Sequence, residues 1–151
     1  MLSNIGNILL VTILLFSSLI VFSSLENLNN NNNSISKKIY TFCLIQSTLI
    51  IICFFTLIAG FIISDFSLIT VYENSHSLKP IFYKISGTWG NHEGSLLLWI
   101  IILILFSFIF LITNKNHPKN FRIYTLVTQN VLIIGFLFFI LFNSNPFSAI
   151  S

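Results

Sequence analysis

The sequence predicts an all-α membrane protein with four transmembrane helices, and two observations carry that prediction. Hydrophobic residues make up 55% of the 151 positions and charged residues only 7%, whereas soluble proteins average about 25% charged residues. The apolar residues also gather in four long runs. Each run reaches the roughly 20 residues that a helix needs to cross a bilayer core of about 30 Å. Composition and segment length together exclude a water-soluble domain.

We expect one helix in each of these runs, within a single membrane domain 1–151: residues 5–24, 39–63, 94–113 and 123–142. None of the four runs contains Asp, Glu, Lys, Arg or His. Because a proton or ion path usually places an ionisable residue inside the membrane, the helices are predicted to be a scaffold. The first run lacks the basic start and the small-residue cleavage site of a secretory signal, so we expect it to stay in the mature chain.

The two cysteines, Cys43 and Cys53, both lie in the second run. Ten residues apart on one helix, they point to different faces, so their spacing predicts neither a disulfide nor a metal site. We expect them to be packing residues.

The three connections differ in composition. The first, residues 25–38, contains an Asn-rich tract that is too polar to pack and is predicted to be a variable, mobile loop. The third, "NKNHPKNFR", is a short turn broken by Pro118, with His117 expected among the lipid headgroups. The second, residues 64–93, has too many apolar positions for a freely solvated loop, and we expect it to fold back onto the membrane surface.

The basic residues predict an orientation. Five of the seven cations lie in the first and third connections, and such residues mark the matrix or cytoplasmic side of a membrane protein. Both termini and the connection 64–93 are therefore expected on the outer side, in the intermembrane space or periplasm. The five cations are Lys37, Lys38, Lys115, Lys119 and Arg122.

The candidate functional site lies in "SGTWGNHEGSLLLW", residues 86–99. Trp89 and Trp99 are expected to flank the boundary between water and lipid, where an indole ring is most favourable. Glu93 and Ser95 lie at the predicted start of the third helix, Gly94, where a carboxylate and a hydroxyl can bind free backbone N–H groups.

Two histidines raise the question of a metal or haem ligand. His92 could bind haem iron through one ring nitrogen, but a histidine beside a helix start also fits a purely structural role. His76 has no second ligand at a metal-site spacing. The spacing therefore assigns no metal site and no catalytic residue.

Several sequence blocks together resemble a known family: "DFS" at 65–67, "YENS" at 72–75, "LKPIFYKISGTWGNHEGSLLLW" at 78–99 and "FNSNPF" at 142–147. They are similar to the N-terminal part of the CcmF-type haem lyases, which act in cytochrome c maturation. The long block is a specific signal, unlike a two- or three-residue pattern. The resemblance covers residues 61–147.

The resemblance implies a function. A haem lyase of this type joins haem, delivered by a CcmE-type carrier, to the thiols of a C-x-x-C-H motif in apocytochrome c. The chain has no such motif, so it is expected to belong to the machinery. Its outer connection is expected to support a haem site held by the wider complex. The supporting residues would be Trp89, His92, Glu93 and Trp99, and no nucleic acid is expected as a partner.

The family members continue into further helices, a tryptophan-rich segment and haem-ligand histidines that are absent here. The resemblance therefore implies one piece of a split lyase, with the remaining fragments supplied by another chain. Frequent Ile, Phe, Asn and Lys suggest an AT-rich genome such as a mitochondrial one. The expected location is the mitochondrial inner membrane, or the bacterial inner membrane if the chain is prokaryotic.

Two other functions fit four uncharged helices. One is a small structural subunit of a mitochondrial respiratory complex, although a packing subunit has no need of the block "GTWGNHEGSLLLW". The other is half of a transporter, which is disfavoured because no inverted repeat or broken helix is apparent.

Overall fold

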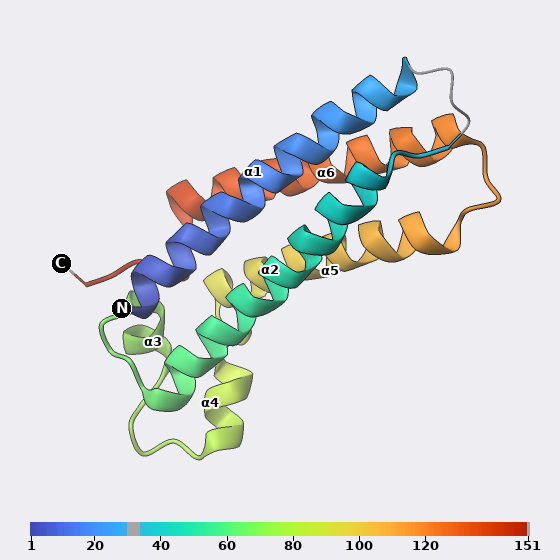
Figure 1. Ribbon diagram of the computed structural model, residues 1–151. Helices are drawn as coiled ribbons and strands as arrows, with labels where there is room; N and C mark the ends of the chain where they lie inside the picture. The colour runs from blue at the N-terminus through green and yellow to red at the C-terminus, as the bar shows by residue number, and fades with distance from the viewer. Residues whose placement is uncertain (30–33, 151) are drawn as a thin grey trace.

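The computed structural model describes residues 1–29 and 34–150. Within these ranges it is all-helical, apart from an isolated β-bridge between Leu68 and Ala149, which confirms the predicted class. Four helices are long and apolar enough to cross a membrane, and two short helices lie together at one end (Figure 1). The helices are α1 (Leu2–Leu28), α2 (Lys37–Ile63), α3 (Ile69–Asn74), α4 (Ile81–Gly87), α5 (His92–Thr113) and α6 (Lys119–Asn143).

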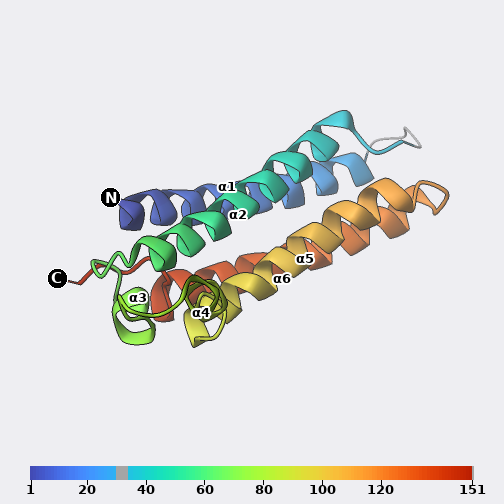
Figure 2. The ribbon, with the colours of Figure 1, turned by 90° about the horizontal axis from the view of Figure 1, so that it is seen from below.

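The four long helices form an up-and-down bundle. Helix α1 packs against α2 and α6, and α5 packs against the same two helices, so the order around the bundle is α1, α2, α5, α6 (Figures 1 and 2). The N-terminus, the tail after α6, and helices α3 and α4 all lie at one end (Figure 1). This arrangement agrees with the predicted grouping of both termini with the connection 64–93.

The long helices extend beyond their predicted bounds. Helix α1 continues to Leu28 and α2 begins at Lys37, so both ends of the predicted loop 25–38 are helical, while its residues 30–33 lie outside the described part of the chain. Helix α6 begins at Lys119, four residues before the predicted start. Polar residues at a membrane surface can continue a helix because water and headgroups satisfy their side chains, so hydropathy alone underestimates helix length.

The connection 64–93 contains two short helices that the sequence analysis did not predict. Pro80 precedes α4 and Gly87 ends it. Proline fits before the first turn of a helix because its missing N–H has no partner there.

The buried apolar residues form two clusters along the bundle, with a polar layer between them. Each long helix contributes one residue to the polar layer. That residue lies midway between a member of the first cluster and a member of the second, for example between Ile13 and Ile20 on α1. All four side chains of the layer are at least 98% buried: Ser17, Gln46, Ser107 and Asn130.

Gln46 links two other residues of the polar layer, Ser17 and Asn130, whereas Ser107 Oγ is buried without a hydrogen-bond partner. Gln46 Nε2 donates hydrogen bonds to Ser17 Oγ at 2.6 Å and to Asn130 Oδ1 at 3.2 Å, so one side chain links α1, α2 and α6. Such bonds between transmembrane helices contribute about 0.6 kcal/mol each on average, with a maximum of about 1.7 kcal/mol. This layer was not predicted from the sequence, because its residues are polar but not ionisable.

Arg122 joins three helices at the end opposite α3 and α4. Its Nη2 donates to Tyr40 Oη at 2.8 Å and to the backbone oxygen of Leu111 at 2.6 Å. The sequence analysis placed Arg122 in the third connection, but it lies in the first turn of α6 and is only 6% exposed. Its side chain turns inward because the last carbonyl groups of α5 have no partner within their own helix.

Replacing Gln46 tests the polar layer. We expect Gln46→Met, which keeps the side-chain volume but removes both hydrogen bonds, to lower the free energy of unfolding by about 0.6 to 1.7 kcal/mol. Titration with a denaturing detergent, starting from mild micelles, measures this difference. Thr48→Val, at an exposed position of the same helix, is the control and should stay within about 0.5 kcal/mol of wild type. Equal stability of all three proteins would contradict a stabilising role for the layer.

Candidate functional site

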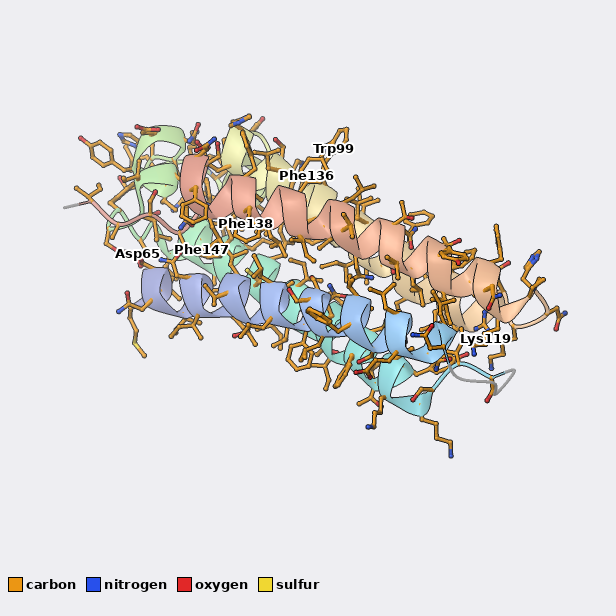
Figure 3. The ribbon with its side chains drawn as sticks, turned by 90° about the horizontal axis from the view of Figure 1, so that it is seen from above. Asp65, Trp99, Lys119, Phe136, Phe138 and Phe147 are labelled. Atoms are coloured by element: carbon orange, nitrogen blue, oxygen red, sulfur yellow. The ribbon has the colours of Figure 1, made fainter. Side chains whose placement is uncertain are left out.

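The blocks that carry the family resemblance meet at one end of the bundle. We call this the α3–α4 end and define it as residues 1–7, 60–95 and 144–150. Figure 3 shows Asp65 and Phe147 at this end and Lys119 at the opposite one. The blocks are far apart in the sequence, so the fold brings them together.

The tail after α6 is bound to the start of α1. Ser3 Oγ donates to the backbone oxygen of Phe147 at 2.6 Å, and Asn145 Nδ2 donates to Asn7 Oδ1 at 2.8 Å. Asn145 Oδ1 accepts from the Phe147 backbone N–H at 2.9 Å, which fixes the turn in "SNPF". The Phe147 ring is fully buried against Gly6, where any Cβ would overlap it.

The same tail pairs with the connection after α2. The backbone N–H of Ile69 donates to the oxygen of Ser148, and that of Ile150 donates to the oxygen of Ser67, both at 3.0 Å. Asp65 Oδ1 accepts from the Ser67 backbone N–H at 3.2 Å and from its hydroxyl at 2.6 Å. The block "DFS" is therefore a turn that presents its backbone to the tail.

Lys84 connects α4 to the end of α2. Its Nζ donates to Ser64 Oγ at 2.6 Å and lies 3.4 Å from the oxygen of Ile62, and the residue is only 9% exposed. Ser64 ends α2 in the left-handed conformation, with φ 56°. An ammonium group beside the last carbonyl groups of a helix is stabilised by the helix dipole. Lys84 thereby fixes α4 against the bundle.

Asn91 shapes the turn between α4 and α5. Its Oδ1 accepts from the Gly94 N–H at 2.7 Å and so caps α5, while its Nδ2 donates to the oxygen of Gly87 at 2.8 Å and to that of Thr88 at 3.3 Å. One side chain thus satisfies the end of one helix and the start of the next.

The prediction that Glu93 and Ser95 bind free backbone N–H groups at the start of this helix was wrong. Helix α5 begins at His92, two residues before the predicted start at Gly94, and Asn91 is its cap. Ser95 Oγ instead donates to the oxygen of His92 at 2.9 Å. Gly94 is required for space, because any Cβ there would overlap the backbone oxygen of Thr88. The cap falls on Asn91 because only its backbone is still extended.

The two tryptophans of the predicted site lie apart. Trp89 stacks on Phe54 of α2, with ring centroids 6.4 Å apart and planes at 26°, and it is 41% exposed. Trp99, on α5, is 62% exposed and points away from the bundle (Figure 3). Trp89 therefore helps to pack the α3–α4 end, whereas Trp99 has most of its ring free.

His92 and Glu93 lie on the first turn of α5. The His92 side chain is exposed and Glu93 is half-buried. In the part of the chain that the structure describes, the side chains of His92 and Glu93 form no hydrogen bond or ion pair. His92 and Trp99 are seven residues apart on α5 and share one helix face. The side chains of His92 and Glu93 are therefore not used to stabilise the fold.

The described residues contain no group of three or more His, Cys, Asp or Glu residues that could hold a metal ion. The three histidines, His76, His92 and His117, are all exposed and lie in different segments. Both cysteines are free and buried in α2, as expected of packing residues.

Sequence reasoning missed two residues that build this end, Lys84 and Asn91. Lys84 and Thr88 are four residues apart and both buried, and this spacing on one helix face is the signal that could have identified an inward-facing lysine. Asn91 could have been found as the Asn that precedes Gly94 by three residues, the N-cap spacing.

Comparison with curated proteins gives clear similarity over part of the chain. The chain is 46% identical over 100 residues to the cytochrome c-type biogenesis protein CycK of Rhizobium meliloti. It is 48% identical over 104 residues to ccl1 of Rhodobacter capsulatus and 39% identical over 95 residues to CcmF of Escherichia coli, both also named cytochrome c-type biogenesis proteins. No protein-family model and no solved structure matches the chain.

The matches are unequal in their coverage of the two partners. The matched segments cover 66%, 69% and 63% of this chain, but only 15%, 16% and 15% of the three relatives. The chain therefore corresponds to a small part of each relative.

The fold defines the class, a helical membrane protein with several spanning helices. By sequence, the chain is a homologue of the CcmF-type cytochrome c biogenesis proteins over part of their length. This confirms the resemblance carried by the sequence blocks. None of the three relatives is named as a respiratory-complex subunit.

Replacing Gly94 tests the packing of the turn between α4 and α5. We expect Gly94→Ala to lower the free energy of unfolding by about 1 to 3 kcal/mol, the usual cost of overpacking, because the new methyl group overlaps a backbone oxygen that cannot rotate away. Detergent unfolding measures the loss. Gly87→Ala is the matched control, since a Cβ there would meet its nearest atom at an ordinary 3.5 Å. A stability of Gly94→Ala equal to that of the control would show that the turn opens without cost.

Proposed function

We propose that the chain forms the N-terminal, membrane-embedded part of a haem lyase that assists the covalent attachment of haem to apocytochrome c. One observation carries the proposal: relatives 46% and 48% identical to the chain are cytochrome c-type biogenesis proteins. The chain would supply the scaffold and part of the outer surface, and the haem ligands would come from elsewhere in the assembly.

The partners follow from the resemblance to the haem lyases. The matched segment covers about 15% of each relative, and the remaining fragments of the lyase are proposed as partners. The full assembly would receive haem from a CcmE-type carrier and act on apocytochrome c. The membrane would be the mitochondrial inner membrane, or the bacterial inner membrane in a prokaryote.

The charge distribution supports an orientation for this assembly. The end opposite α3 and α4 holds Lys37, Lys38, Lys115 and Arg122, and clustered cations mark the matrix or cytoplasmic side. The α3–α4 end would then face the intermembrane space or periplasm. Cytochromes c are matured in that compartment, so the proposed orientation agrees with the proposed work.

His92 and Glu93 are proposed to support the haem site, together with Trp89 and Trp99. The first turn of α5 is fixed by Asn91 and Gly94, yet the side chains of His92 and Glu93 have no partner among the described residues. A rigid backbone that presents unused polar groups is suited to orienting groups of a neighbouring chain. No bond-making step is assigned to them.

Chemical labelling tests the orientation. We expect Ser77→Cys, at the α3–α4 end, to react with a membrane-impermeant maleimide in intact mitoplasts or spheroplasts, and Asn116→Cys to react only after permeabilisation. Both positions are exposed, whereas Cys43 and Cys53 are buried. The reverse pattern of labelling would contradict the orientation and the proposed role of the α3–α4 end.

Alanine substitution tests the supporting residues. We expect His92→Ala and Glu93→Ala each to lower the amount of covalent holocytochrome c about tenfold, since removing groups that orient ligands typically costs 10- to 100-fold. Haem-stained gels measure holocytochrome c, and immunoblots of membranes measure the variant chains, which should stay at wild-type levels. His117→Ala, at the opposite end, is the control and should have no effect. Unchanged cytochrome c in both variants would refute the supporting role.

A further inference from the structure

One glycine in α6 has no explanation within the fold. Gly135 lies in the helix interior, is exposed, and would have nothing within 4 Å of an added Cβ. At Gly6, Gly60 and Gly94, by contrast, an added Cβ would meet a tightly packed neighbour. Since glycine destabilises a helix interior by about 1 kcal/mol relative to alanine, the bundle itself gains nothing from Gly135.

Gly135 belongs to an outward-facing stripe of α6. Positions three, four and seven residues apart share a helix face, which places Gly135 in line with the residues one, two and three turns before it and one turn after it. All of them are exposed. We define the α6 stripe as Tyr124, Thr128, Leu132, Gly135 and Phe139.

Two hollows follow one another along this stripe. One is lined by α6 residues around Gly135 together with Leu96 of α5. The other lies nearer the start of α6, around Tyr124 and Thr128, and includes Gln129, whose Oε1 is buried without a hydrogen-bond partner. The surface therefore combines a missing side chain, polar groups and two shallow hollows on a helix that is long and apolar enough to span a membrane.

Such a surface offers few favourable contacts to lipid chains, whereas a second transmembrane helix can pack closely against it. Small residues let two transmembrane backbones approach closely, and Thr or Gln side chains can form hydrogen bonds across the interface. All four spanning helices of this chain are already packed against one another, so the occupant must come from outside the described chain.

We propose that the α6 stripe docks a membrane-spanning helix of the second chain that supplies the rest of the lyase. The relatives extend far beyond the matched segment, which covers 15% or 16% of their length, and the proposed function assigns the rest of the lyase to a partner. The inference rests on the proposed function, and it names where the two parts of the assembly meet.

Affinity purification from solubilised membranes tests the docking face. We expect Gly135→Leu to lower the recovery of the partner chain at least tenfold, which corresponds to about 1.4 kcal/mol of binding free energy. Gly135→Ala should lower it less, because its side chain is smaller. Thr48→Leu, at an exposed position of α2, is the matched control and should keep full recovery. Mass spectrometry quantifies the partner, and detergent unfolding should show that Gly135→Leu still folds.

A photo-crosslinking amino acid at Val131 provides an independent measurement. Val131 is 52% exposed and lines the hollow beside Gly135, so we expect crosslinks to the partner chain, and none from the same amino acid at Thr48. Crosslinks from Val131 to lipid alone, or to a second copy of this chain, would overturn the inference.

The outcomes separate the two proposals. If wild type recovers a cytochrome c biogenesis chain and Gly135→Leu recovers it equally well, the docking face is wrong and the proposed function stands. If wild type recovers no such chain, both proposals fail.

Discussion

The absence of a solvent for polar groups inside a bilayer is the constraint on which this structure depends. Every backbone group within the membrane must find its partner inside the protein, and the four long helices meet that demand. Several side-chain hydroxyl groups follow the same rule: Thr12, Ser18 and Thr56 each donate to the backbone oxygen four residues earlier. Side-chain hydrogen bonds between helices lie in the layer around Gln46 and near the two ends of the bundle.

The same constraint explains how much of the fold the sequence predicts. A run of about 20 apolar residues has few alternatives to a spanning helix, so all four spans were found. The ends of the helices were not predicted correctly, because residues at the membrane surface, such as Lys119 or Leu28, can be helical or non-helical at a similar cost in free energy. Helices α3 and α4 have six and seven residues, too few turns for a periodic pattern to appear in an already apolar segment.

The candidate site was predicted less well, and the reason is again physical. Glu93, Ser95 and Asn91 are all residue types that cap helices, so the choice among them depends on where the backbone becomes helical. That point is Asn91, whose backbone is still extended and whose Oδ1 accepts from the Gly94 N–H. The contacts of Lys84 with Ser64, and of Ser3 with Phe147, join residues 20 and 144 positions apart. No local pattern predicts such pairs.

Some side chains and helix surfaces are fully used by the fold, whereas others have no partner within it, and the two proposals concern the latter. At the α3–α4 end, residues such as Asn91, Lys84 and Asn145 are fully occupied by turns and caps, and their sequence is explained by folding alone. His92 is not occupied, nor is the space above Gly135. In a membrane, an unpartnered polar group or an unfilled helix face costs free energy. Where such features persist, a neighbouring molecule that completes them is the simplest physical account.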